Sequence, residues 1–276
     1  MTFDMGRTWS RGIELVKENF RLLAIIAGIF LLLPTLAAYL LIPGLQDMME
    51  PGADPEKVAE MLLANLGPLI GFVVVAMVFQ FAGYGAMVAL MGDTRPTVGE
   101  AIKRGFTITP STFGILLLFM LGYFILSLIA MVPISLLAAA VGAPGLAALG
   151  AIVVLVVVVW LLARMCMGMQ VLVFEDTLNP VTAVKRSFAL TKPAQWRILG
   201  FWAVLTVAYI VIALLASSIF TLLGAALGNG VAGMLVVGLT NGIMAMIVGM
   251  IVCGLAVAMY GQLAGPSESS IAETFD

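Results

Sequence analysis

Two long stretches of this chain contain no charged side chain, and they constrain the fold more than any other feature. No Asp, Glu, Lys or Arg occurs in residues 105–163 or in residues 198–267. A hydrocarbon core about 30 Å thick is crossed by about 20 apolar helical residues, so each stretch can hold two membrane spans. A soluble bundle would need charged outer faces, and soluble domains carry about 25% charged residues, whereas this chain has 10%. The two stretches therefore predict an integral membrane protein.

Helices are favoured over a β-barrel because the apolar residues do not alternate with polar ones. A barrel strand alternates lipid-facing and lumen-facing residues over about 10 positions, whereas residues 151–163 and 242–260 are apolar on every face. A continuous helix also pairs all of its own backbone N–H and C=O groups inside the bilayer. We therefore expect an all-α, polytopic membrane protein.

The apolar segments predict six spans in a single transmembrane domain over residues 1–264. The spans are expected at about residues 22–42, 66–91, 111–140, 146–174, 197–223 and 234–263. A kink is expected at Pro133, and a short helix is expected after Pro55 in the acidic loop between the first two spans. Residues 265–276 form a short acidic tail.

The basic residues predict the orientation of the chain. Eleven of the 13 Lys and Arg residues fall before the first span, between spans two and three, or between spans four and five. Arg164 lies just inside the same end of span four, and only Lys57 falls on the other side. Loops rich in Lys and Arg stay in the cytoplasm. The chain is therefore expected in a bacterial inner membrane with both termini in the cytoplasm.

One cytoplasmic connection repeats another. The sequence Ala-Ile-Lys-Arg-Gly-Phe-Thr-Ile-Thr at residues 101–109 recurs 82 positions later, at residues 183–191, as Ala-Val-Lys-Arg-Ser-Phe-Ala-Leu-Thr. A weaker third copy relates residues 19–23 to residues 195–199. These matches predict three repeats, at about residues 1–91, 92–174 and 175–264, each an amphipathic helix followed by two spans.

The amphipathic helices allow two compatible interpretations. Trp9, Ile13, Val16 and Phe20 form an apolar stripe in the first helix, and Val181, Val184 and Phe188 form one in the third, where Asn179 can cap and Pro180 suits the first helical position. Such a helix can lie among lipid headgroups with its basic residues toward anionic lipid. It can also brace the bundle from below.

Little in the sequence points to catalysis. The chain has no histidine, the residue most often used as a general acid or base and as a metal ligand. Cys166 and Cys253 lack metal-site spacing. Five acids come from one stretch that is read as a solvated loop: Asp47, Glu50, Asp54, Glu56 and Glu60. We therefore expect no enzyme, no cofactor, no metal and no nucleic-acid partner.

Arg164 is the one ionisable residue set well inside a span. It lies eleven residues before Glu175, which is about 16 Å along a helix. An intramembrane arginine is costly, and it marks either a functional site or a side chain that snorkels or caps carbonyls. The residues singled out as candidates for lipid or partner binding are Arg164, Glu175, Lys185, Arg186, Lys103 and Arg104.

Glycine pairs four residues apart predict close helix packing. They are Gly224 and Gly228, Gly238 and Gly242, and Gly261 and Gly265. This spacing lets two helices approach closely. The pairs could therefore serve contacts within the chain or the faces of a homo- or hetero-oligomer.

A resemblance to a known family covers about 37 residues from Arg164 to Gly200. Its marks are Arg164, Val-Phe-Glu175, Pro180, Ala183, Lys185-Arg186-Ser187-Phe188, Leu190-Thr191 and Trp196. This pattern resembles the membrane domain of some bacterial glycerophosphodiester phosphodiesterases, and YciC-like inner-membrane proteins of unknown role. It departs at Lys192-Pro193, where a glycine is more usual. The catalytic barrel of the fused enzymes has no counterpart, so the resemblance implies a membrane module that handles or senses lipid.

These observations leave several classes of function open. The leading expectation is a non-enzymatic inner-membrane protein that engages anionic phospholipid, or a membrane partner, through its basic amphipathic helices. The alternatives are an uncoupled transporter or channel for a small or apolar solute, and an auxiliary subunit of a larger membrane complex. A lipid-active enzyme is disfavoured, because histidine and a carboxylate pair are missing.

Overall fold

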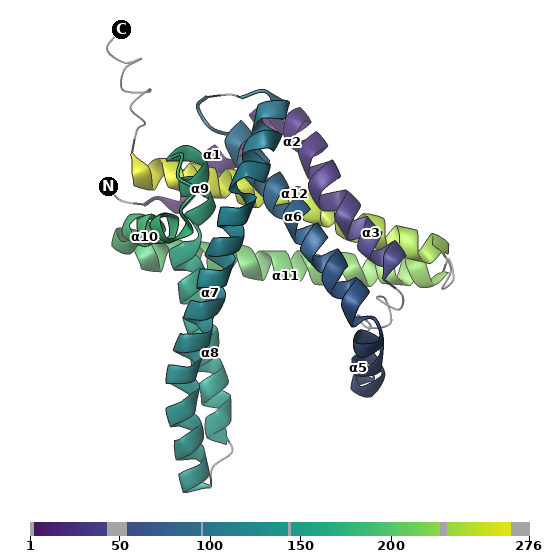
Figure 1. Cartoon of the computed structure of the whole chain (residues 1–276), viewed down its shortest axis with the longest axis vertical. Helices are drawn as coiled ribbons and strands as arrows, with labels where there is room; N and C mark the ends of the chain where they lie inside the picture. Colours follow the sequence, from purple (N-terminus) through teal and green to yellow (C-terminus); the bar gives the residue numbers. More distant parts are fainter. Residues whose placement is uncertain (1–2, 43–53, 95, 143–144, 227–230, 266–276) are drawn as a thin grey trace. The chain divides into compact units, whose positions relative to one another are not determined.

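A computed structural model describes residues 3–42, 54–94, 96–142, 145–226 and 231–265, and every element in these ranges is a helix (Figure 1). The elements are α1 (Met5–Glu18), α2 (Phe20–Ala27), the π-helical turn η1 (Gly28–Leu32), α3 (Leu33–Leu41), α5 (Pro55–Ala64), α6 (Leu66–Leu90), α7 (Val98–Val141), α8 (Gly145–Met165), α9 (Gly168–Phe174), α10 (Pro180–Thr191), the 3₁₀ turn η2 (Lys192–Ala194), α11 (Gln195–Ala226) and α12 (Val231–Ala264).

Six helical segments among the described residues are long and apolar enough to cross a membrane. They are Phe20–Leu41, Leu66–Leu90, Val98–Val141, Ile152–Phe174, Pro180–Ala216 and Leu235–Ala264. The predicted all-α fold with six spans is confirmed, and the chain is a multi-pass membrane protein.

The elements differ from the expected ones in two places. The third span and the amphipathic helix before it form one continuous helix, α7, which runs through both Pro110 and Pro133. The fourth span is interrupted between Met165 and Gly168, so α8 and α9 are separate helices. The short helix expected after Pro55 is present as α5, where the Asp54 carboxylate accepts a hydrogen bond from the Glu56 N–H at 3.0 Å.

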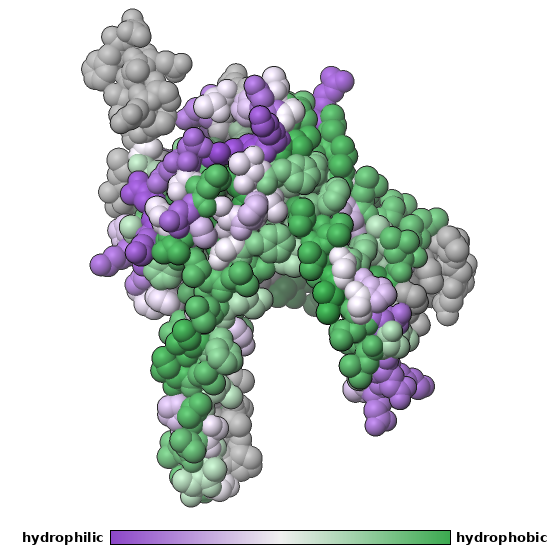
Figure 2. Space-filling model, in the orientation of Figure 1, coloured by the Kyte–Doolittle hydropathy of each residue, from purple (hydrophilic) through white to green (hydrophobic). Residues whose placement is uncertain are grey.

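The described residues group into two compact units. Unit 1 draws on Met1–Ser10, Pro110–Thr206 and Ala256–Asp276, and unit 2 draws on Arg11–Thr109 and Val207–Leu255. Within unit 1, Figure 2 shows hydrophilic residues over α9 and α10 and apolar residues along the far lengths of α7 and α8.

The three amphipathic helices begin in the same way. At α1 the Asp4 carboxylate accepts from the Arg7 N–H at 2.8 Å. At α7 the Thr97 hydroxyl accepts from the Glu100 N–H at 3.3 Å, and the Glu100 carboxylate accepts from the Thr97 N–H at 2.8 Å. At α10 the Asn179 side chain accepts from two N–H groups, at 2.9 and 3.3 Å. The expected cap at Asn179 is confirmed, and all three caps satisfy N–H groups that a helix start leaves open.

The three helices also bury the same positions. Counted from the capping residue, the residues four, eight, eleven and twelve places later are buried, and the other residues of each amphipathic segment are not. The buried sets are Thr8, Gly12, Leu15 and Val16 in α1; Ala101, Gly105, Ile108 and Thr109 in α7; and Ala183, Ser187, Leu190 and Thr191 in α10. This spacing places the four residues of each set on one helical face.

The residue eight places after each cap is small because another helix lies directly against it. A Cβ atom at Gly12 would stand 2.9 Å from the Leu255 Cα of α12, and one at Gly105 would overlap the Ala82 carbonyl oxygen of α6. In α10 the same place holds Ser187, whose hydroxyl donates to the Arg164 carbonyl oxygen of α8 at 2.7 Å. Each amphipathic helix therefore packs on a span through a small residue.

The large apolar side chains of these helices do not all face the bundle. Trp9 is 46% exposed, Phe20 55% and Val181 45%. The stripes expected in α1 and α10 are thus only partly buried, and Val16 is the buried member of the first stripe. The bundle takes small residues where two helices approach most closely, together with aliphatic side chains such as Leu15 and Ile108. The rings of Trp9 and Phe20 are exposed instead.

Close packing also accounts for one of the three glycine pairs. A Cβ atom at Gly238 would lie 3.0 Å from the Leu36 Cδ1, and one at Gly242 would lie 3.2 Å from the Leu32 carbonyl oxygen. The pair therefore lets α12 approach the first span within unit 2. Gly261 has no neighbour of this kind within 4 Å, and Gly228 lies outside the described residues.

Candidate functional site

Arg164 lies at the end of α8 with its side chain turned into unit 1. The residue is 7% exposed. Its Nη1 donates to the Thr191 hydroxyl at 3.0 Å, and its guanidinium carbon lies 4.7 Å from the centre of the Phe188 ring. Both partners belong to α10. Arg164 therefore faces the interior of unit 1, and its acceptor is a hydroxyl, which the sequence did not indicate.

The break between α8 and α9 lies directly beside Arg164. The Ser187 hydroxyl donates to the Arg164 carbonyl oxygen at 2.7 Å and accepts from the Met167 N–H at 3.2 Å. These two bonds satisfy backbone groups that an unbroken helix would pair internally. Among the described residues, the Nε of Arg164 has no hydrogen-bond partner. No sequence signal announced this break.

Glu175 joins the end of α9 to two other helices. Its Oε1 accepts from the Arg186 Nε at 2.8 Å and from the Tyr260 hydroxyl at 3.0 Å. The Phe174 and Tyr260 rings also lie against each other, with centres 5.3 Å apart. Glu175 therefore pairs with Arg186 and not with Arg164, and Tyr260 of α12 is a partner that sequence reasoning missed.

The remaining basic candidates lie on the outer sides of α7 and α10. Lys103 and Lys185, which the repeat places in equivalent positions, are both exposed, and neither side chain makes an ion pair or hydrogen bond with any described residue. Arg104 is half-buried and already has a partner. In α1, Arg11 pairs with Glu14 at 2.8 Å and Glu18 at 3.4 Å. Lys103 and Lys185 are thus the candidate cations left free for a ligand.

The described ranges contain no cluster of three or more His, Cys, Asp and Glu residues that could hold a metal ion. Of the five loop acids, Asp47 and Glu50 lie outside the described residues. Asp54 caps α5, and Glu56 and Glu60 are exposed on that helix.

Comparison of the chain with models of known protein families, with curated protein sequences and with solved structures finds no match.

Proposed function

We propose that this chain is a non-enzymatic protein of a bacterial inner membrane that binds anionic phospholipid through its amphipathic helices. One observation carries the proposal. Each helix packs on a span through one small residue and leaves a basic residue and a bulky apolar residue on the outside. Large exposed apolar side chains on a cytoplasmic surface would be unfavourable in water. At the level of the headgroups their rings are in a favourable environment, and neighbouring cations meet phosphate.

The exposed rings recur at the ends of the spans to which these helices lead. Phe106 is 42% exposed in α7, and Trp196, which opens α11, is 70% exposed. Trp9 in α1 and Phe20, which opens α2, also have exposed rings. Tryptophan and other aromatic side chains gather at membrane interfaces because one part of the ring system is apolar and another tolerates water. The rings support an interfacial position for all three helices.

The free lysines supply the preference for anionic lipid. A Lys or Arg near an anionic membrane surface contributes about 1 kcal/mol of attraction. Lys103 and Lys185 can contribute it in full, whereas Arg186 is already paired with Glu175. The common caps, the common buried positions and the 82-residue match further support three repeats that each present a lipid-facing helix on the cytoplasmic side.

The test is lipid binding by the purified full-length chain in detergent, followed by native mass spectrometry with phosphatidylglycerol and phosphatidylcholine. The double variant Lys103→Gln and Lys185→Gln loses about 2 kcal/mol of attraction for the anionic lipid, which is about thirtyfold in affinity. Binding of phosphatidylcholine stays the same. Adding Arg104→Gln and Arg186→Gln lowers the affinity for phosphatidylglycerol further, but by a smaller factor than the two lysine changes do.

The matched control is Lys57→Gln, which removes an exposed lysine from α5 on the opposite side of the membrane. It should leave the binding of both lipids unchanged. Equal retention of phosphatidylglycerol by the parent and the lysine variants would refute the proposal.

A further inference from the structure

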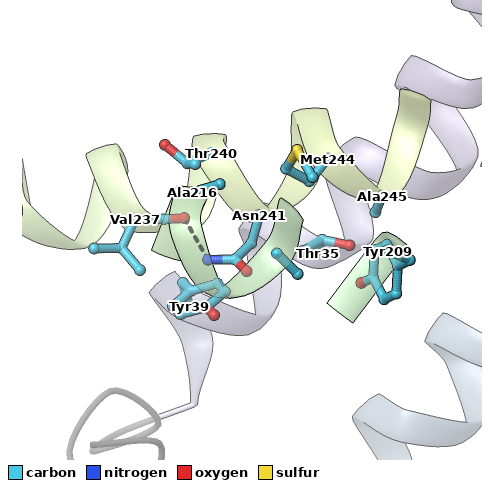
Figure 3. Close-up of a pocket in the computed structure, with 10 residues that line it drawn as sticks. Thr35, Tyr39, Tyr209, Ala216, Val237, Thr240, Asn241, Met244 and Ala245 are labelled. Carbon is cyan, nitrogen blue, oxygen red and sulfur yellow. Dashed lines mark hydrogen bonds between the residues drawn. The ribbon is translucent and has the colours of Figure 1, made fainter. Parts of the chain in front are cut away.

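A cavity of about 250 Å³ lies among the spans of unit 2 (Figure 3). It is lined by Thr35 and Tyr39 of α3, by Tyr209, Ala213 and Ala216 of α11, and by Val237, Thr240, Asn241, Met244 and Ala245 of α12. Half of these residues carry a hydroxyl or an amide group, which is a high share for the interior of membrane spans.

The hydrogen bonds of the lining determine what the cavity offers to a ligand. Thr35 donates its hydroxyl proton to the Leu31 carbonyl at 2.7 Å, and Thr240 donates to the Val236 carbonyl at 2.8 Å. Asn241 donates from Nδ2 to the Val237 carbonyl at 2.9 Å, the bond drawn in Figure 3. Both threonine hydroxyl protons and one of the two Asn241 Nδ2 protons are used within their own helices. The threonine oxygens and the Asn241 Oδ1 therefore remain as acceptors, and one Asn241 N–H remains as a donor.

The lining contains no charged side chain, so nothing in it would balance the charge of an ionic ligand. Ala213, Ala216 and Ala245 keep the space open between the polar groups. A volume of about 250 Å³ is about eight times the share of one water molecule in the liquid. The cavity thus combines room for a small group, an excess of acceptors and a neutral wall.

We propose that this cavity binds a neutral molecule through its hydroxyl groups. The hydroxyls of the ligand donate to the Asn241 Oδ1 and to the threonine oxygens, and the Tyr209 phenol can donate or accept. Two sources offer this chemistry: the glycerol headgroup of a diacylglycerol, entering from the bilayer, and a free polyol. Exposed apolar residues on α3 and α12, such as Leu40 and Leu239, offer a path for acyl chains in the first case.

The experiment uses the purified full-length chain with three probes: dioleoylglycerol, trioleoylglycerol and glycerol. Trioleoylglycerol has the same chains but no hydroxyl. Dioleoylglycerol should bind in native mass spectrometry and trioleoylglycerol should not. A rise in melting temperature with glycerol, absent in the cavity variants, would instead identify the free polyol as the source. Failure of both dioleoylglycerol and glycerol to bind would overturn the proposal.

Two variants attack the cavity by different means. Asn241→Leu removes the amide acceptor at similar size, and Ala216→Leu fills the space without touching a polar group. Each should lower the affinity for the hydroxylated ligand by about tenfold or more, since a ligand hydroxyl left unpaired costs at least about 1.4 kcal/mol of binding free energy. Because Ala216→Leu leaves the Asn241 bond intact, it serves if Asn241→Leu fails to fold.

The control is Ser218→Ala in α11. Its hydroxyl bonds to the Leu214 carbonyl at 2.7 Å and lies outside the lining, so ligand affinity should not change. Undiminished binding in both cavity variants would count against the site. Loss of dioleoylglycerol with retention of phosphatidylglycerol would show that this site is separate from the basic helices.

Discussion

The Ser187 hydroxyl lies 2.7 Å from the Arg164 carbonyl oxygen and thereby ties α10 to the end of α8. The equivalent contacts in α1 and α7 are made by Gly12 and Gly105, which have no side chain to offer. Only in α10 is the span beneath broken, between Met165 and Gly168. The serine replaces a glycine where the neighbouring backbone needs a partner.

Replacing Ser187 with alanine should therefore destabilise the protein. The change leaves the Met167 N–H without its side-chain acceptor and leaves the Arg164 carbonyl only the longer bond from the Thr191 hydroxyl, at 3.5 Å. A buried unsatisfied polar group costs about 1–3 kcal/mol. The measurement is the melting temperature in detergent, with Ser218→Ala as the control, since that serine bonds only within its own helix. Equal melting temperatures for the two variants would contradict the role given to Ser187.

A double-mutant cycle tests the buried pair of Arg164 and Thr191. Thr191→Val keeps the shape and removes the oxygen that accepts from the guanidinium, leaving a buried charge without a side-chain acceptor. In the background of Arg164→Met no charge needs that oxygen, so the same change should cost less. We expect the two effects to differ by about 1 kcal/mol, a typical coupling for residues in direct contact. Additive effects would show that the hydrogen bond contributes nothing to stability.

Arg164→Met alone separates a structural role from a binding role. The Arg164 side chain touches Phe188 and Thr191 of α10, so a structural role predicts a lower melting temperature with lipid binding by the lysines retained. A variant as stable as the parent that loses anionic lipid would instead place Arg164 in the ligand site.

The sequence was sufficient to predict the spans, because two long stretches without charged side chains are stable as helices inside a lipid bilayer and not in water. It also predicted the cap at Asn179, since this cap follows from local chemistry. It was harder to predict which side chains of the amphipathic helices face the bundle. Hydrophobic spacing placed Trp9 and Phe20 on one apolar stripe without deciding whether it faces lipid or the bundle; both residues are exposed. Where two helices approach most closely, as at Gly12 and Gly105, the size of the residue decides whether it can face the other helix.

The partners of the candidate site depended on contacts far apart in the chain. Tyr260 reaches Glu175 across 85 residues, and Thr191 reaches Arg164 across 27. Nothing in the spacing of a single sequence specifies such pairs. The interruption after Met165 was equally hidden, because the residues around it, from Cys166 to Met169, include no proline and only one glycine.

Reporter fusions test the orientation expected from the basic residues. Fusions after Asp93 and after Asp176, which follow the second and fourth spans, should report the cytoplasm. A fusion at Asp54, just before α5, should report the opposite side. Lys57→Gln should not alter the reported orientation, because the other twelve basic residues all favour the same side. A cytoplasmic signal from Asp54 would invert the whole assignment and remove the interfacial role of α7 and α10.

Two glycines of α7 provide a test of close packing within one helix. A Cβ at Gly105 would overlap the Ala82 carbonyl and come within 3.0 Å of the Ala86 N, which are backbone atoms of α6 that cannot turn aside. Gly105→Ala should therefore force α7 away from α6 and lower the melting temperature strongly, because an overpacked contact costs about 1–3 kcal/mol of stability.

The control is Gly99, which is exposed and where an added Cβ would have no atom within 4 Å. Gly99→Ala should leave stability unchanged or raise it by up to about 1 kcal/mol, since alanine is the better helix former. Both changes add one methyl group to the same helix, so the difference between them isolates the contact. If both variants had the same melting temperature, α7 would not lie on α6 at Gly105. The shared buried positions of the three amphipathic helices would then not mark contacts with the spans.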